Sequence, residues 1–280
     1  MDRIIEILTK KYGRMRPLSG GFTHVAYRLE GPSPLVAKVA SRSKHDIDNE
    51  VKAITFLQEA AYAPKPVDSL SADGFSAIVT TYIEGVNGQA VLDTGDIERS
   101  EALFRRMGVR LAKDIHARRY DGDARGLRIA RPDAYPFYAP FLPEWAVAAS
   151  RSFLARIDDT PRKDWVFTHG DFGAHNVLDQ NDGGPPVIDW EWAEWFHPLA
   201  DVAWACWNTK LHYPQIAEHL NRTFLAAYQS VRPINATPDL IKAYSLYKIW
   251  TILDKIRDAE ADVQEKWVKR LIWTLTEANF

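Results

Sequence analysis

The stretch Val-Phe-Thr-His-Gly-Asp-Phe-Gly-Ala-His-Asn-Val-Leu, residues 166–178, together with Pro-Val-Ile-Asp-Trp, residues 186–190, carries the strongest signal in this chain. Short apolar runs on either side enclose a polar segment, which predicts strands that present a polar loop between them. Asn176 follows Asp171 by five residues, and Asp189 follows Asn176 by thirteen. The loop therefore carries a spaced set of oxygen-bearing side chains.

Transfer of a phosphoryl group to an alcohol requires such a set. One carboxylate accepts a hydrogen bond from the attacking hydroxyl and orients it, while two further oxygen donors hold Mg²⁺ against a triphosphate. Mg²⁺ prefers hard oxygen ligands, and an asparagine with an aspartate supplies them with modest negative charge. The segment therefore indicates a kinase that uses a magnesium-bound nucleoside triphosphate.

A lysine upstream supports this interpretation. Lys38 lies within an apolar run at residues 35–40 that predicts a strand, where burial costs free energy unless a partner offsets it. In kinases such a lysine contacts the α- and β-phosphates and pairs with a glutamate on a helix. Residues 46–59 carry apolar side chains at helical spacing, so Glu50 is the expected partner and Glu59 the alternative.

A pair of glycines, Gly20 and Gly21, separates two predicted strands within residues 16–29. Glycine lets backbone amides approach a phosphate closely, although a glycine pair between strands is also common in simple hairpin turns. The turn is therefore a candidate phosphate-binding loop because of its combination with Lys38, and not by itself.

The chain changes character at a turn-rich segment, residues 82–88. Strands and one helix are predicted before it, and helices dominate after it, including residues 144–157 and the whole chain beyond Pro198. We therefore expect an α+β fold of two lobes. The boundary predicts a small β-rich lobe at residues 1–84 and a larger, mainly helical lobe at residues 85–280.

Composition excludes several classes of protein. The 280 residues include 35 basic and 37 acidic side chains, a balance that argues against a nucleic-acid-binding protein. The single cysteine, Cys206, forms no internal disulfide and fits a reducing compartment. Nothing resembles a signal peptide or a run of roughly 18 apolar residues, so we expect a cytoplasmic protein without a membrane span. The sequence carries no signal for an oligomeric state.

The pattern His-Gly-Asp-x-x-x-x-Asn at residues 169–176, followed by Ile-Asp at residues 188–189, resembles the aminoglycoside phosphotransferase and choline kinase superfamily. The wording of residues 169–178 is similar to that of the hygromycin-type branch. The likeness extends from about Leu18 to Ala203 and implies a protein-kinase-like fold with the nucleotide between two lobes.

The resemblance also implies roles for individual residues. Asp171 would be the catalytic base, and Asn176 and Asp189 would be the Mg²⁺ ligands. His169 would shape the catalytic loop, and Asp201 would brace it. The nucleotide, ATP or GTP, would meet the glycine turn, the lysine pair and the segment between the lobes: Ser19, Gly20, Gly21, Thr23, Lys38, Glu50, Thr81, Tyr82 and Ile83.

The partner implied is a small-molecule hydroxyl acceptor, with an aminoglycoside, and hence antibiotic resistance, expected first. Polycationic aminoglycosides need acidic side chains for charge-assisted hydrogen bonds. The candidates are Glu191, Glu194, Asp254 and Asp258. Choline, homoserine, a sugar or a macrolide remain alternatives, and tryptophans such as Trp192 and Trp204 offer the aromatic surface that a choline-type ammonium would use.

Two other classes of function remain open. His169, His175, Asp171 and Asp189 could form the site of a metal-dependent phosphohydrolase, which would cleave phosphoesters without ATP. That interpretation leaves Lys38 without a role. A non-catalytic nucleotide-binding protein would bind ATP and never consume it with any hydroxyl acceptor.

Overall fold

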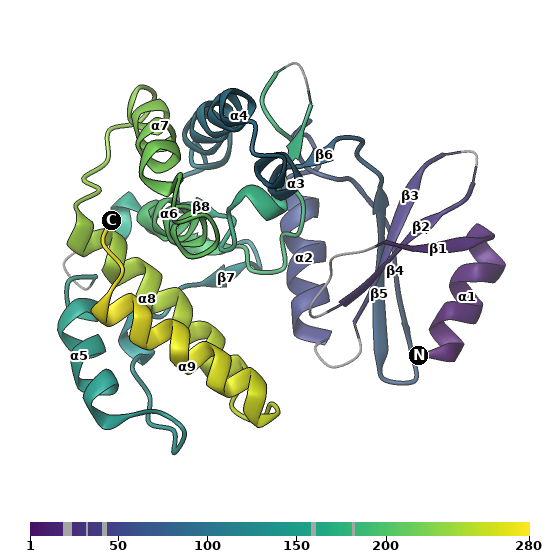
Figure 1. Ribbon diagram of the computed structural model, residues 1–280. Helices are drawn as coiled ribbons and strands as arrows, with labels where there is room; N and C mark the ends of the chain where they lie inside the picture. The colour runs from purple at the N-terminus through teal and green to yellow at the C-terminus, as the bar shows by residue number, and fades with distance from the viewer. Residues whose placement is uncertain (19–23, 32, 41–43, 158–160, 181–182) are drawn as a thin grey trace.

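The computed structural model describes residues 1–18, 24–31, 33–40, 44–157, 161–180 and 183–280. A five-stranded antiparallel sheet with two helices forms the N-terminal part, and helices with two small sheets form the rest (Figure 1). The N-terminal elements are α1 (Asp2–Tyr12), β1 (Met15–Leu18), β2 (His24–Leu29), β3 (Leu35–Ala40), α2 (Lys44–Phe56), β4 (Pro66–Ala72) and β5 (Phe75–Thr81).

The N-terminal sheet has the strand order β1-β2-β3-β5-β4, so β3 lies at its centre. Successive side chains of a strand point to opposite faces. Ala37 and Val39 pack with Ile4 of α1, whereas Ala40 joins the larger core to which α2 also contributes. The intervening Lys38 therefore points to the face that α2 covers. Figure 1 shows α2 between this sheet and the helical part of the molecule.

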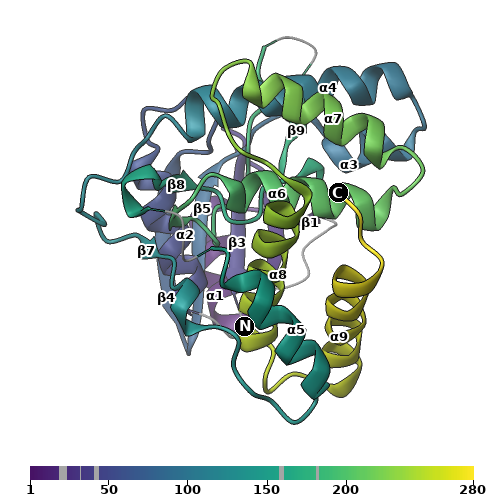
Figure 2. The same ribbon diagram turned by 90° about the vertical axis from the view of Figure 1, so that its left-hand side faces the viewer.

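The helical part packs around α6 and α8, which contact each other and most of the neighbouring helices. Figure 2 shows this part from the side opposite the sheet. Its helices are α3 (Gly88–Asp93), α4 (Ile97–Arg110), α5 (Glu144–Leu154), α6 (Leu199–His212), α7 (Ala217–Gln229), α8 (Pro238–Lys255) and α9 (Ala261–Thr276). Within the described residues, no helix combines the length and apolar character needed to cross a bilayer.

Two small sheets support the polar loop. They are β7-β10-β8, made of Arg128–Ile129, Glu194–Phe196 and Val166–Thr168, and β6-β9, made of Val86–Asn87 and Leu178–Asp179. Buried aromatic rings pack beside them: Phe167 of β8 stacks on Trp190, with centroids 5.7 Å apart and planes at 11°. The strand that precedes the Asp171 loop therefore packs against the segment that carries Asp189.

The structure confirms the expected α+β, kinase-like class and differs from the sequence predictions locally. The predicted strand at residues 35–40 coincides with β3, whereas α1 and β4 were not predicted. The helix α4 continues as a π-helical turn at Leu111–Ile115. The division into residues 1–84 and 85–280 stays a prediction. Ser19, Gly20, Gly21 and Thr23 lie outside the described residues.

Candidate active site

Asp171 lies in the loop after β8, and three side chains hold its carboxylate. Oδ1 accepts a hydrogen bond from Trp204 Nε1 of α6 at 2.6 Å. Oδ2 accepts from Asn176 Nδ2 at 3.0 Å and lies 3.3 Å from His175 Nε2. The side chain keeps 22% of its surface exposed. The carboxylate is therefore fixed in orientation while part of it remains accessible.

Electrostatics keep this carboxylate ionised. Burial alone would raise the pKa of Asp171, but the positive charges of His175 and Lys248 hold that pKa well below its usual range. Conversely, although burial opposes it, the charge of Asp171 raises the pKa of His175. A carboxylate of such low basicity acts mainly by accepting and orienting the hydrogen bond of a hydroxyl, and takes the proton as bond formation advances.

A buried network anchors the start of the loop. Asp201 accepts hydrogen bonds from the backbone N–H groups of His169 and Gly170, each at 2.7 Å. The Oδ2 atom of Asp201 that accepts from His169 also lies 3.0 Å from His116 Nε2, whose Nδ1 lies 2.8 Å from the hydroxyl of Tyr228. Asp201, His116 and Tyr228 have no solvent exposure. Asp201 thus contacts the loop backbone, as the brace expected from the sequence would.

Gly170 itself is required by the close approach of two chain segments. Its φ is +76°, and a Cβ atom there would lie 2.1 Å from the carbonyl oxygen of Trp192. Any other residue would therefore force the loops carrying Asp171 and Asp189 apart.

Lys38 links the N-terminal sheet to a cluster of three carboxylates. Its Nζ lies 2.9 Å from Glu50 on α2, 2.5 Å from Asp189 and 3.0 Å from Glu191. Burial opposes the charged form, but the three carboxylates outweigh it and hold the pKa of Lys38 well above its usual value. The pair Lys38–Glu50 expected from the sequence is therefore in contact, whereas Glu59 lies exposed.

The backbone links Asp189 to the Asp171 loop. The N–H of Ile188 donates to the carbonyl of Asn176 at 2.9 Å, and His169 Nε2 lies 2.9 Å from the carbonyl oxygen of Ile188. Asp189 itself has a φ of +66°, a left-handed conformation that aspartate tolerates better than most residues. Strained backbone of this kind concentrates at functional sites.

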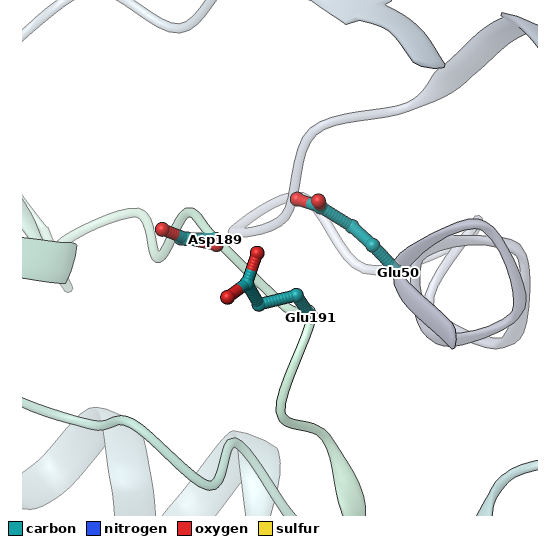
Figure 3. A group of neighbouring side chains, drawn as sticks. All are labelled: Glu50, Asp189 and Glu191. Carbon is teal, nitrogen blue, oxygen red and sulfur yellow. The ribbon is translucent and has the colours of Figure 1, made fainter. Parts of the chain in front are cut away.

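Oxygen donors suited to a hard divalent cation gather in this region. Oxygens of Glu50, Asp189 and Glu191 lie within 4.8 Å of one another, and Figure 3 shows the three carboxylates facing a common space from two separate segments. The ammonium of Lys38 already contacts all three, and Asp189, with 38% of its side chain exposed, is the most accessible of them. Asn176 donates through Nδ2 to Asp171, and its Oδ1 has no hydrogen-bond partner among the described residues. Carboxylate and amide oxygens are the ligands that Mg²⁺ prefers.

The segment at the end of β5, residues 81–83, includes backbone groups without a hydrogen-bond partner among the described residues. The N–H groups of Thr81 and Tyr82 donate to the carbonyls of Lys65 and Pro34, each at 3.0 Å. Neither backbone group of Ile83 has a partner within the described residues. Of the three residues expected to meet the purine, Ile83 therefore has a free backbone donor and acceptor.

The four acids expected to bind an acceptor have diverse surroundings. Glu191 contacts Lys38, with Lys255 3.9 Å away, and burial raises the pKa of Glu194 to about 7.

Asp254 pairs with Arg257 at 2.7 Å. Asp258 lines a surface cavity of about 420 Å³ that Tyr138 and Arg257 also line. Among the described residues, neither of these two aspartates contacts Asp171.

A second network ties α2 to the helical part. Asp46 of α2 lies 3.0 Å from Arg128 and 2.6 Å from Lys255 of α8. Asn49, one turn along, donates to the carbonyls of Glu191 and Ala193 at 3.0 and 2.9 Å. The helix that carries Glu50 is therefore fixed relative to the loop that carries Asp189.

The sequence analysis did not assign Trp204 or Lys248 to the surroundings of Asp171. Trp204, whose indole N–H donates a hydrogen bond to Asp171, was considered only as aromatic surface. Lys248 of α8 is buried, and a signal for it exists: like Lys38, it is a lysine inside an apolar run, Tyr-Lys-Ile-Trp at residues 247–250.

The kinase-like fold, the oriented carboxylate of Asp171 and the partly buried Lys38 are together typical of phosphotransferase enzymes. The chain belongs to the phosphotransferase enzyme family, whose model matches residues 14–237. This confirms the resemblance found in the sequence. Among curated protein sequences, none matches the chain.

Solved structures of aminoglycoside phosphotransferases share the fold. APH(4)-Ia is 18% identical with a TM-score of 0.71, and the match covers 98% of each chain. APH(3'')-Id from Streptomyces rimosus, in complex with ADP and streptomycin, is 15% identical with a TM-score of 0.65, covering 89% of this chain and 97% of the other. APH(9)-Ia, in complex with ADP and spectinomycin, is 14% identical with a TM-score of 0.62, covering 97% and 93%.

Proposed function

We propose that this phosphotransferase moves the γ-phosphoryl group of a magnesium-bound nucleoside triphosphate, ATP or GTP, to a hydroxyl of a small molecule. Residues 1–84 would form the nucleotide-binding lobe, and residues 85–280 would supply the catalytic loop and the acceptor site. The cytoplasm, which supplies both Mg²⁺ and nucleotide, is the compartment that we propose for the reaction.

One observation carries this proposal: Lys38 contacts Asp189 directly, and the segment of Asp189 bonds to the segment of Asp171 and Asn176. Phosphoryl transfer needs a lysine for the triphosphate, oxygens for the cation and a carboxylate for the alcohol. These groups come from distant parts of the chain and meet here. A phosphohydrolase would not need Lys38 and Glu50 in this arrangement.

Each group has a proposed part in the reaction. Asp171 accepts the hydrogen bond of the attacking hydroxyl, held in place by Trp204 and Asn176. Lys38 binds triphosphate oxygens, and the free backbone groups of Ile83 meet the purine. Asn176 Oδ1 and Asp189 would hold Mg²⁺, which would supply neutralisation of negative charge on the phosphates. Transfer is direct and in line, and its acceleration comes from positioning and electrostatics.

An aminoglycoside is the acceptor that the sequence favours, and the solved structures of similar fold support it, since the second and third of them carry an aminoglycoside-type antibiotic and ADP. Choline, homoserine, sugars and macrolides are the other acceptors of the proposed class. The surroundings of Glu191 and Glu194 weigh against a polycation, because Lys38 already contacts Glu191 and burial raises the pKa of Glu194 to about 7.

An acceptor screen tests the proposal. The protein is supplied with ATP or GTP, with Mg²⁺ or with EDTA, and with aminoglycosides, macrolides, choline, hydroxy amino acids and sugars, while release of nucleoside diphosphate is followed. We expect release that requires both Mg²⁺ and one class of acceptor. Nucleotide binding without turnover for every acceptor, or phosphoester cleavage without nucleotide, would contradict the proposal.

A further inference from the structure

Lys248 of α8 is a buried cation without a conventional partner. The residue is 8% exposed, and its Nζ has no hydrogen-bond partner among the described residues. The ammonium lies 3.3 Å from the ring centroid of Trp192 and 5.8 Å from that of Trp204. A lysine offers three N–H donors, and burial of such a group is costly unless oxygens accept them.

A second lysine on the same helix does have a carboxylate partner. Lys255 lies two turns further along α8 and also contacts Trp192, at 4.4 Å from the ring centroid. It forms an ion pair with Asp46 at 2.6 Å. Lys248 has no such pair within the parts of the chain that are described, although the carboxylates of Asp171 and Glu194 act on it through space.

Lys248 belongs to the neighbourhood of the reacting alcohol. Trp204 contacts both groups: its Nε1 donates to Asp171 at 2.6 Å, and its ring centroid lies 5.8 Å from the Lys248 ammonium. The two charges also influence each other, since Lys248 lowers the pKa of Asp171. A group bound by Lys248 would therefore belong to the same acceptor whose hydroxyl Asp171 orients.

We propose that the acceptor carries an oxyanion, a carboxylate or a phosphate, which Lys248 binds beside the hydroxyl presented to Asp171. This inference rests on the proposed function and names its substrate class. The oxyanion takes the position that the face of the Trp192 indole holds against Nζ in this structure. Charge-assisted hydrogen bonds to the ammonium then replace a cation–π contact, which is the weaker interaction.

The charge of Lys248 favours an anion at its own position. An ammonium placed against Nζ would meet a like charge, in surroundings of low dielectric where like charges repel strongly, whereas a carboxylate or phosphate there meets attraction. The ionised carboxylate of Asp171 has the opposite effect at its own position. The proposed acceptor therefore turns its neutral hydroxyl to Asp171 and its oxyanion to Lys248.

Matched acceptors test the oxyanion directly. Hydroxy acids are compared with their amides, and sugar phosphates with the free sugars, by kcat/KM from ADP release; an aminoglycoside panel is the third arm. We expect one of the anionic members to exceed its neutral partner about 10- to 100-fold, the effect of a hydrogen bond to a charged group. The pair that shows the preference distinguishes carboxylate from phosphate.

The variant Lys248→Met then assigns the effect. It should bring the ratio of kcat/KM between the anionic acceptor and its neutral partner down to about one, whatever it does to the neutral partner alone. Lys242→Met is the matched control, because Lys242 lies on the same helix beside Phe153 and should change neither value. If Lys248→Met does not fold, the test is the ratio of kcat/KM for the anionic and neutral acceptors in the unaltered protein.

The outcomes separate the two proposals. Turnover confined to cationic or neutral acceptors, or an equal loss for both members of a pair in Lys248→Met, overturns the oxyanion site and leaves the kinase function standing. Absence of acceptor-dependent turnover throughout overturns the proposed function and this inference with it.

Discussion

Lys38 Nζ lies 2.5 Å from Asp189 Oδ1, although 151 residues separate the two in the chain. The contact joins the centre of the N-terminal sheet to the loop that follows the catalytic segment. Glu50 and Glu191 complete the surroundings of the same ammonium. A single buried cation thus holds together the groups that we propose for phosphate and metal binding.

Asp189→Ala should abolish the dependence of nucleotide affinity on Mg²⁺. Loss of a residue that only hydrogen-bonds a metal ligand already lowers metal affinity roughly 10- to 100-fold. Loss of a ligand itself should lower the affinity at least as much. Calorimetric titration with ATP, in Mg²⁺ and in EDTA, measures the difference. Asp262→Ala, an exposed change on α9, is the control. An unchanged Mg²⁺ effect in Asp189→Ala would show that the cation binds elsewhere.

Asp46→Ala should loosen α2 from the helical part. It leaves Arg128 and Lys255 without the carboxylate that lies 3.0 and 2.6 Å from them. We expect the free energy of unfolding to fall by about 1.5–3 kcal/mol, the contribution of a hydrogen bond to a charged group, together with a higher KM for nucleotide. Urea unfolding and steady-state kinetics measure both. Asp48→Ala on the same helix should change neither, and equal effects would refute the assignment.

The stability of the protein should depend on pH through Glu194. Its pKa is raised from 4.5 to about 7 by burial, so between these values the folded state binds more protons than the unfolded state. Stability contributed by the protonated carboxyl is complete below pH 4.5 and is lost as pH rises through 7. The loss amounts to at most about 3 kcal/mol. Thermal unfolding of Glu194→Gln from pH 4.5 to 7.5 should show a flatter profile than the original protein; parallel profiles would contradict this.

Much of the fold and part of the site were predictable because they depend on local patterns. The strand around Lys38 is an apolar run with sharp ends, and the spacing from Asp171 to Asn176 lies within one loop. The helix α1 was not predicted, although Ile4 and Leu8 lie four residues apart, the spacing of one helical face, so this signal was local and was overlooked. The state of Lys248, in contrast, depends on residues far apart in the chain.

Long-range packing also explains the uncertainty over the acceptor acids. Glu191 is an acidic residue in a plausible place, but its contact with Lys38, 153 residues away in the chain, follows from tertiary packing. Asp254, in contrast, pairs with Arg257 three residues further on, a spacing that the sequence itself offers. Charge counted along the sequence therefore overestimated how acidic the acceptor site is.

Phosphorus-31 NMR of the complete reaction tests the central claim, that Asp171 aims an acceptor hydroxyl at the γ-phosphorus. With Mg²⁺, ATP and an acceptor found by screening, we predict a phosphate monoester signal that grows in step with ADP. In Asp171→Asn that signal should form about 10²- to 10⁴-fold more slowly, the contribution of a positioned general base, while affinity for ATP is unchanged. Inorganic phosphate as the sole product, or monoester formed equally fast by Asp171→Asn, would contradict the account.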